Sequence, residues 1–358
     1  MAKFALRLEA RPTPSRLMAW LSPVLAVLLT VLCGALLFLA LGHDPLAGLA
    51  VFFVEPLRDA HGWSELGIKV APLLLIAVGL AICFRANIYN IGAEGQLTLG
   101  AICGGAAALY LDDGVGGATV IGVSLLAGMA GGMAWAGLVA WLRDRYNASE
   151  ILVSLMLVYI AQLLLSYLVY GVLRDPEGFN FPQSKLLSDG LLLPMVISDT
   201  RLHVGIIFAL LASLGGWLYL SRSIAGFRLR VGGMAPAAAR YAGFSSRKTL
   251  WSSLLICGAL SGLAGACEVL GPMGQLTPTV SPGYGFAAII VAFVGRLHPV
   301  GVLFSSFVMA LFYIGGELAQ SRLGLPSAIT GVFQGILLFA LLACDVLIQY
   351  KLRWRKHG

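Results

Sequence analysis

The chain has 358 residues, of which 59% are apolar and only 11% carry a charge, and its mean hydropathy is +0.88. Soluble domains carry about 25% charged residues, and a soluble chain this apolar would expose large sticky patches. This composition excludes a soluble enzyme and predicts a multi-pass, all-α membrane protein. The net charge of +7 fits contact with anionic membrane lipid rather than nucleic acid, because no basic patch is interleaved with aromatic residues.

Apolar runs recur along the chain between charged or Pro/Gly-rich breaks, and a helix that crosses a bilayer needs about 20 such residues. The first run is longer than the apolar core of a signal peptide, which favours a retained span. The eighth is short, so it either borrows the Pro/Thr/Ser-rich stretch before it or is a broken helix. The ten predicted spans are residues 17–41, 66–84, 91–111, 117–142, 150–173, 203–221, 249–270, 277–295, 299–318 and 326–349.

The positive charges give the orientation of these spans. With the N-terminus inside and ten spans, most of the 24 Lys and Arg residues fall in cytoplasmic segments, as the positive-inside rule requires. Both termini are therefore expected in the cytoplasm, as an N-terminal segment 1–16 and a basic tail 350–358 around a transmembrane domain 17–349. Five spans in each half would be related as an inverted repeat, which many transporters share.

The sequence lacks the usual patterns of metal sites, disulfide frameworks and enzymes, and its small residues indicate closely packed helices. The six cysteines form no CxxC pair and the five histidines no HxxxH or HExxH pattern, so neither a metal site nor a disulfide framework is expected. No phosphate-binding P-loop and no GxSxG pattern occur, so an enzyme is not expected. Close helix packing is indicated by the GxxxG pairs Gly100/Gly104, Gly128/Gly132, Gly258/Gly262 and Gly331/Gly335.

A polar stretch at residues 84–96 joins the second and third predicted spans. Arg85 ends the second span and Asn90 or Gly92 begins the third, which places Glu94 in a first turn, where a carboxylate complements the helix dipole. Helix capping is one interpretation of this stretch. The other is a polar pathway, because ionisable residues within spans usually face such a cavity rather than lipid. The pathway residues would be Asn87, Asn90, Glu94 and Gln96.

A long, basic inside loop at residues 222–248 is the second unusual stretch. Pro236 suits the first position of a helix and Gly243 suits its C-terminal end. We therefore predict a helix of one to two turns that presents Arg240 and Tyr241. The loop is either a positively charged inside segment or a docking element for a cytoplasmic partner.

Three further acidic residues lie within the predicted spans, at Glu268, Glu317 and Asp345. Each is near a span end, which favours snorkelling or capping over a proton relay.

These stretches give the chain a family resemblance over about residues 65–345. It resembles the membrane subunits of ABC importers in the branched-chain amino acid/ribose/nucleoside permease superfamily, and most closely the general nucleoside and simple-sugar permeases. The segments that carry the resemblance are Asn90–Gln96, Gly226–Gly233, Ala238–Gly243 and Gly285–Gly301.

The resemblance implies partners that the chain itself does not supply. Two such permeases, identical or homologous, would form the pathway in the bacterial inner membrane, above two cytoplasmic ATPases and below an extracytoplasmic substrate-binding protein. ATP and Mg²⁺ would bind the ATPases, so no cofactor is expected on this chain. The residues expected to couple to the ATPase are Arg228, Arg230, Gly233, Pro236, Ala238, Arg240, Tyr241 and Gly243.

The solute is less constrained than the family. Amides, hydroxyls and a single carboxylate, without an intramembrane arginine cluster, fit a neutral hydrogen-bonding solute, with nucleosides as the main interpretation and simple sugars such as ribose as the alternative. The rival from another class is an ion-coupled secondary transporter. It is disfavoured because paired deep carboxylates are lacking and because it would not need the 222–248 loop.

Overall fold

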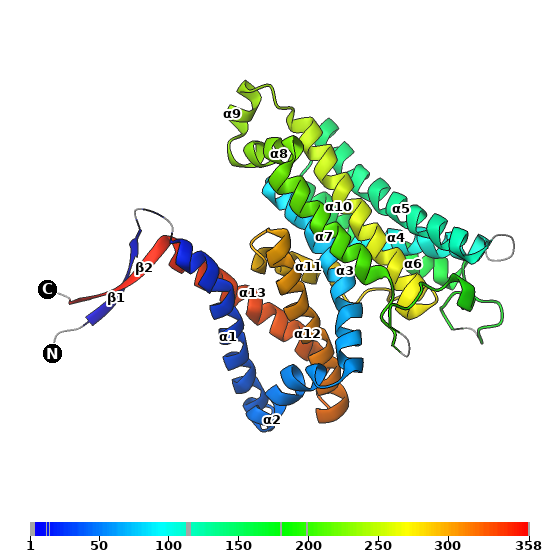
Figure 1. The fold of residues 1–358 in the computed structure, drawn as a ribbon, viewed down its shortest axis with the longest axis horizontal. Helices are drawn as coiled ribbons and strands as arrows, with labels where there is room; N and C mark the ends of the chain where they lie inside the picture. The colour runs from blue at the N-terminus through cyan, green and yellow to red at the C-terminus, as the bar shows by residue number, and fades with distance from the viewer. Residues whose placement is uncertain are drawn as a thin grey trace. The chain divides into compact units, whose positions relative to one another are not determined.

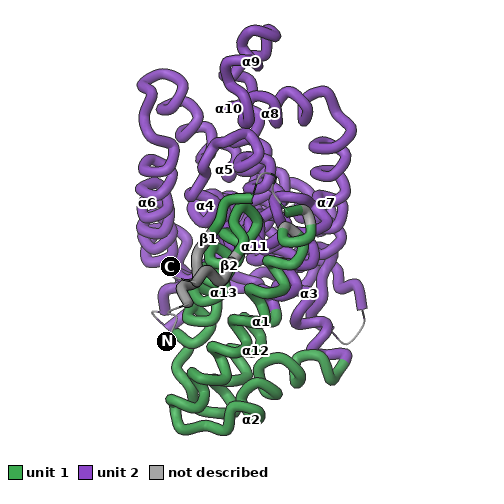
Figure 2. The backbone as a smooth tube through the Cα atoms, turned by 90° about the vertical axis from the view of Figure 1, so that its left-hand side faces the viewer, with its two compact units in different colours: residues 1–59, 311–358 green, residues 60–310 purple. Residues whose placement is uncertain are grey.

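The computed structural model describes residues 4–11, 13, 15–111, 116–179, 181–197 and 200–356. The chain divides into two compact units, shown in Figure 2. Unit 1 comprises Met1–Asp59 with Leu311–Gly358, and unit 2 comprises Ala60–Ala310.

Unit 2 is a bundle of helices that run side by side in Figure 1. The most buried of its long apolar helices is α3, in which 89% of the residues of the apolar stretch are buried inside the protein. The elements are α3 (Ala60–Arg85), α4 (Ala93–Leu111), α5 (Gly117–Tyr146), α6 (Glu150–Tyr170), a 3₁₀ turn (Asp189–Leu191), α7 (Gly205–Arg222), α8 (Ile224–Met234), α9 (Pro236–Tyr241), α10 (Ser246–Glu268), a π-helical extension (Val269–Met273), α11 (Tyr284–Val294) and the first half of α12 (Pro299–Leu323).

Glycines form the core contact between α4, α5 and α10. A methyl group at Gly100 would overlap the backbone of Gly262, and one at Gly132 would overlap the backbone of both Gly258 and Gly262. Without side chains at these points the three backbones approach closely, which is how small residues drive helix association in lipid. Three of the four GxxxG pairs lie at this interface. By contrast, Gly331 has nothing within 4 Å of its added methyl group, so the motif in α13 (Ala328–Gln349) makes no such contact in the described residues.

The connection between α10 and α11 is irregular, and a long loop satisfies its backbone. Leu193 donates to the Leu270 carbonyl at 2.8 Å, Leu187 to the Gly274 carbonyl at 2.8 Å, and Ser184 to the Leu276 carbonyl at 2.9 Å. Non-helical backbone inside a membrane protein requires such partners.

Unit 1 is built around five phenylalanines. Phe52 stacks on Phe333 with ring centroids 4.3 Å apart, and Phe38, Phe53 and Phe312 surround this pair. Its elements are β1 (Phe4–Ala10), α1 (Arg16–Ala40), α2 (Pro45–Leu49), a π-helical turn (Ala50–Val54), a 3₁₀ turn (Glu55–Leu57), the second half of α12, α13 (Ala328–Gln349) and β2 (Tyr350–Lys356).

Eight helices among the described residues are long and apolar enough to cross a membrane, and they coincide with eight of the ten predicted spans. Of the other two predicted spans, α4 is long enough but less apolar, and α11 has only 11 residues. The prediction of a helix over 277–295 is therefore wrong in its first half, because residues 277–283 are not helical. The broken-helix alternative holds there.

Two short parts of the fold were not predicted. The apolar segment Pro45–Leu57 forms helical turns between α1 and α3. The terminal segments form an antiparallel pair from Phe4↔Lys356 to Ala10↔Tyr350, so the otherwise helical chain carries a two-stranded ribbon.

Candidate functional site

The polar stretch between α3 and α4 enters the helix bundle before α4 begins. Gly92 lies against Ser154 and Gly95 against the backbone of Val158. These two α6 residues are four and eight positions after the start of that helix, so α4 begins about 6–12 Å along α6. Its polar groups are thus placed where lipid or protein, rather than bulk water, surrounds them, and they need internal partners.

Asn90 and Gln96 are two of these polar groups, and they bind each other. Asn90 Nδ2 donates to Gln96 Oε1 at 3.2 Å, and Gln96 Nε2 donates back to Asn90 Oδ1 at 3.3 Å. The Gly92 amide donates to Asn90 Oδ1 at 3.0 Å, and the Ile91 amide donates to Ser154 Oγ at 3.1 Å. Both amide side chains are fully buried. The pair holds the turn that leads into α4.

Glu94 is buried as well, with 2% of its surface exposed, and it joins two helices. Its Oε2 accepts a hydrogen bond of 2.6 Å from the amide of Gly285, in the first turn of α11. Gly285 packs directly on the Glu94 backbone, so the N-termini of α4 and α11 meet here. The expected capping role is present, but the carboxylate caps the N-terminus of α11 in addition to complementing the dipole of α4.

A cavity of about 410 Å³ opens beside Glu94. We name it the α4–α6 cavity, and its polar lining comprises Glu94, Thr98, Tyr159, Gln162, Ser166, Thr279 and Ser281. Its volume falls within the range of small-molecule sites. Of the four predicted pathway residues, only Glu94 lines it. Asn87, exposed with φ of 58°, lines a different cavity.

The 222–248 loop folds into α8 and α9, which form one end of unit 2 in Figure 1. As predicted, α9 begins at Pro236, and Gly243 follows it with φ of +77°. Ala239 packs inward at 4% exposure, whereas Arg240 and Tyr241 point outward and Tyr241 is 97% exposed. The helix therefore presents an exposed basic side chain and an exposed aromatic side chain.

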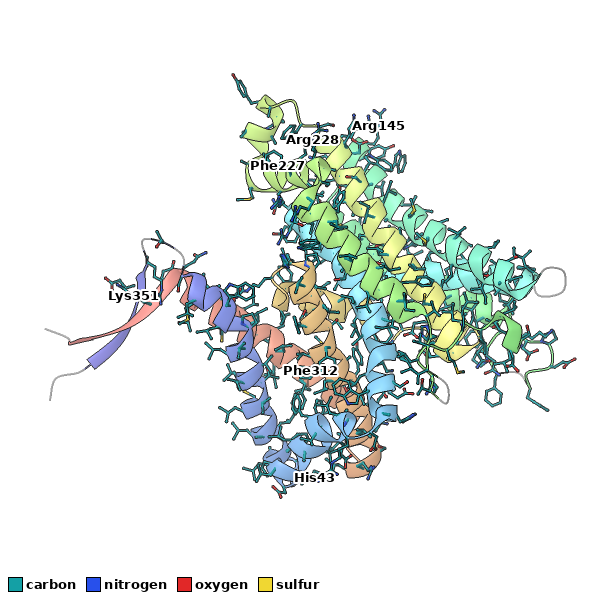
Figure 3. All side chains as sticks on the ribbon, in the orientation of Figure 1. His43, Arg145, Phe227, Arg228, Phe312 and Lys351 are labelled. Atoms are coloured by element: carbon teal, nitrogen blue, oxygen red, sulfur yellow. The ribbon has the colours of Figure 1, made fainter. Side chains whose placement is uncertain are left out.

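Backbone contacts fix α8 to the rest of unit 2. A methyl group at Gly226 would overlap the Tyr219 carbonyl at the end of α7, and one at Gly233 would overlap the Arg85 carbonyl and the Ala86 backbone. The guanidinium of Arg228, labelled in Figure 3, lies 5.5 Å from the ring centre of Phe244. Thus α8 lies directly on the turn that leads from α3 to α4.

The other two residues predicted to couple to the ATPase lie on α8 and α9. Arg230 is half-buried, and its Nε has no hydrogen-bond partner within the described part of the chain. Ala238 is exposed beside Arg240 on α9.

A second cavity, of about 420 Å³, separates α8 and α9 from the α5–α6 turn. The two acidic residues of the cavity lining are paired with arginines. Arg247 Nε lies 2.7 Å from Asp144 Oδ2, and Arg143 Nε lies 3.3 Å from Glu150 Oε2. Arg240 also lines the cavity, so a partner docking here would meet a basic surface.

The three remaining intramembrane acids differ. Glu268 does not snorkel: it is 5% exposed, and it interacts with Tyr284 and Lys69. Asp345 accepts a hydrogen bond of 2.6 Å from Ser22 Oγ. Glu317 is exposed on α12, in agreement with a residue near a span end.

Comparison with known families identifies the chain. A family model described as the permease component of the branched-chain amino acid transport system matches residues 64–342. The chain belongs to this permease family. It is thus a non-catalytic, multi-pass inner-membrane subunit of an ABC transporter, as the resemblance implied.

Relatives of this permease are named after different solutes. It is 32% identical to a glucose ABC transporter permease of Haloferax volcanii over 97% of this chain and 93% of that one. It is 31% identical to a guanosine ABC transporter permease of Bacillus subtilis, with coverage of 90% and 93%. A nucleoside ABC transporter permease of Lactococcus lactis is 27% identical, with 89% of each chain covered.

A solved structure described as an inward-facing conformation of a putative metal-chelate type ABC transporter aligns with 92% of the permease and 99% of that chain. The TM-score is 0.49 and the identity is 17%.

Sequence reasoning missed several residues of the site. Gln162 lies in an apolar run and Ser281 in a Pro/Thr/Ser-rich stretch, and the structure brings both to the same cavity. A polar residue in the middle of an apolar span was the available signal for Gln162.

Proposed function

We propose that this permease carries nucleosides into the cell as part of an ATP-driven importer. The observation that supports this is the α4–α6 cavity, whose described lining offers a carboxylate, an amide and hydroxyls but no lysine or arginine. Such a lining suits a neutral solute with several hydrogen-bonding groups, and relatives named for guanosine and nucleosides share the family.

The partners follow from the family and from the basic α8–α9 surface. A permease of an ABC transporter works with ATPase subunits and a substrate-binding protein. We propose that α9 docks on a cytoplasmic ATPase, that ATP and Mg²⁺ bind there and not on this chain, and that a second permease, identical or homologous, completes the pathway. The termini and α8–α9 then face the cytoplasm, in line with the distribution of positive charges.

A continuous set of contacts links the docking surface to the cavity. Gly233 of α8 packs on Arg85 and Ala86, and Arg85 Nε donates to the Leu297 carbonyl at 2.7 Å, in the turn between α11 and α12. The turn that follows Arg85 and Ala86 continues into α4, where Glu94 binds α11. Movement of α9 on the ATPase would therefore displace α4, whose first turn lines the cavity, together with α11, which Glu94 contacts.

The test is uptake by the complete transporter after reconstitution. Arg240→Glu and Ala238→Trp are expected to reduce ATP-dependent nucleoside uptake to background, because one reverses the charge of the docking face and the other adds bulk to it. Both side chains are exposed, so the variants should still accumulate in the membrane. Normal uptake by both variants would contradict the docking role.

A simple-sugar permease is the second candidate, because the glucose permease of Haloferax volcanii is 32% identical over nearly the whole chain. Co-purification and uptake distinguish the candidates. Recovery of an ATPase with guanosine uptake supports the first, the same complex with glucose uptake supports the second, and gradient-driven uptake by this chain alone would indicate a secondary transporter.

A further inference from the structure

The α4–α6 cavity is bordered by a polar side chain on an otherwise apolar helix surface. Gln162 is exposed and lies 12 residues after the start of α6 at Glu150. That is about 18 Å along a helix that crosses roughly 30 Å of hydrocarbon. Its neighbours on the exposed surface are apolar or aromatic, such as Ile160 at 51% and Leu163 at 70% exposure.

Lipid is an unfavourable neighbour for this part of the surface. An amide that leaves water for hydrocarbon without a hydrogen-bond partner costs several kcal/mol, and Gln162 makes no side-chain hydrogen bond within the described residues. Beside it, Ser166 and Thr279 also line the cavity, and Glu94 forms its inner wall. A face with this composition at mid-membrane depth is expected to border water or a bound solute.

The floor of the cavity is held in a defined shape. Ser281 Oγ accepts hydrogen bonds from the amides of Gly283 and Tyr284 at 3.2 and 3.0 Å, and Glu94 accepts one from Gly285. The hydroxyl and the carboxylate that line the cavity are thus fixed by the first turn of α11, so the site is pre-formed.

The lining also restricts the solute. The side chains of Gln162, Ser166 and Thr279 and the hydroxyl of Tyr159 offer hydrogen-bond donors and acceptors on one part of the wall. The Tyr159 ring, Leu165 and Pro278 offer flat or apolar surface. Anionic solutes are disfavoured by the Glu94 carboxylate and by the absence of lysine and arginine from the described lining. A solute with hydroxyls on one part and a flat ring on another matches both surfaces.

We infer that the α4–α6 cavity is a solute-binding subsite of the transport pathway, and that it takes an uncharged nucleoside, with Gln162 as a specificity-determining contact. The inference rests on the proposed function for its solute class. Its structural part, a water-filled polar cavity reaching mid-membrane beside α6, stands independently of that function and is tested separately below.

The first experiment measures access to water in the assembled transporter, held in lipid nanodiscs so that both faces are reachable. Gln162→Cys and Ile160→Cys are compared using a charged, membrane-impermeant maleimide, and the unsubstituted chain with its six native cysteines gives the background. Labelling of Gln162→Cys alone is expected, because Ile160 does not line the cavity. Equal labelling of both, or no labelling of Gln162→Cys with or without ATP, would overturn the inference.

Protection then tests the solute class. Saturating guanosine is expected to slow labelling of Gln162→Cys at least severalfold, whereas guanosine monophosphate is not. Labelling that no solute slows would overturn the subsite, even if the transporter imports guanosine. Protection by glucose but not guanosine would overturn the nucleoside assignment together with the proposed substrate.

The second experiment measures guanosine uptake by the same complex. Gln162→Leu is expected to lower uptake about tenfold, the effect of losing one hydrogen bond of about 1.4 kcal/mol. Tyr159→Phe and Tyr167→Phe form a matched pair, since each removes one hydroxyl from an exposed tyrosine of α6 but only Tyr159 lines the cavity. A decrease for Tyr159→Phe alone supports the subsite. Unchanged uptake in both Gln162→Leu and Tyr159→Phe, with normal wild-type uptake, would refute it without affecting the proposed function.

Discussion

The carboxylate of Glu94 gives the sharpest test of how the two helix N-termini are held together. Glu94→Ala removes the 2.6 Å acceptor of the Gly285 amide at the junction of α4 and α11, where only 2% of Glu94 is exposed. An unpaired buried donor costs about 1–3 kcal/mol. Removing a negative charge from a helix N-terminus costs about 0.3–1 kcal/mol more. The variant should therefore lose about 1.3–4 kcal/mol of stability.

Glu94→Gln separates these two contributions. The amide oxygen of glutamine still accepts from Gly285, so only the charge contribution is lost and the expected destabilisation is about 1 kcal/mol or less. Glu177→Ala is the control, because Glu177 is exposed in a loop and its removal should change stability by less than about 0.5 kcal/mol.

The assay is unfolding of the purified chain in mixed micelles with increasing denaturing detergent, followed by tryptophan fluorescence. The expected order of stability is wild type and Glu177→Ala, then Glu94→Gln, then Glu94→Ala. If Glu94→Ala unfolds like the wild type, the carboxylate does not stabilise the junction of α4 and α11. If Glu94→Gln and Glu94→Ala are equally destabilised, the charge rather than the hydrogen bond carries the effect.

Two further tests concern helix packing and the coupling of ATP hydrolysis to uptake. Gly262→Ala places a methyl group against the backbone of α5 and should destabilise the chain by about 1–3 kcal/mol. Gly331→Ala is the control, because its methyl group meets nothing within 4 Å, and it should be neutral or slightly stabilising. Detergent unfolding measures the stability of both variants, and equal effects would contradict the close contact between α5 and α10. Arg85→Met removes the donor to the Leu297 carbonyl. The complex should still assemble, but the ratio of transported solute to hydrolysed ATP should fall severalfold. An unchanged ratio would contradict the coupling role of this contact.

The positions of most spans could be predicted because run length and hydropathy are local properties. For the same reason α9 was predicted closely: Pro236 and Gly243 restrict the backbone at its two ends. The motif Gly331/Gly335 shows the limit of this approach. Its spacing is identical to that of Gly258/Gly262, but only the latter faces neighbouring backbones, and a spacing does not state which face of a helix meets a partner.

The site itself depends on contacts that local patterns do not encode. Glu94 was placed correctly in the first turn of α4, but its hydrogen-bond partner Gly285 lies 191 positions further along the chain. Asn90 and Gln96 were predicted to line a pathway together with Glu94. In the structure they bind each other, which polar residues do when both are withdrawn from water. Their assignment to the pathway stays a prediction, which the uptake assay can test.

The contact between Gly233 and the Arg85–Ala86 backbone has a mechanical consequence. A joint formed by two main chains has no side-chain rotamers that could absorb a small displacement, so the two segments shift together or separate. Any larger residue at position 233 would hold α8 away from the Arg85–Ala86 backbone. A displacement of α8 would then be transmitted to that backbone only in part. If α9 docks on the ATPase as proposed, this glycine sets how much of the motion of α9 is passed to α3 and α4.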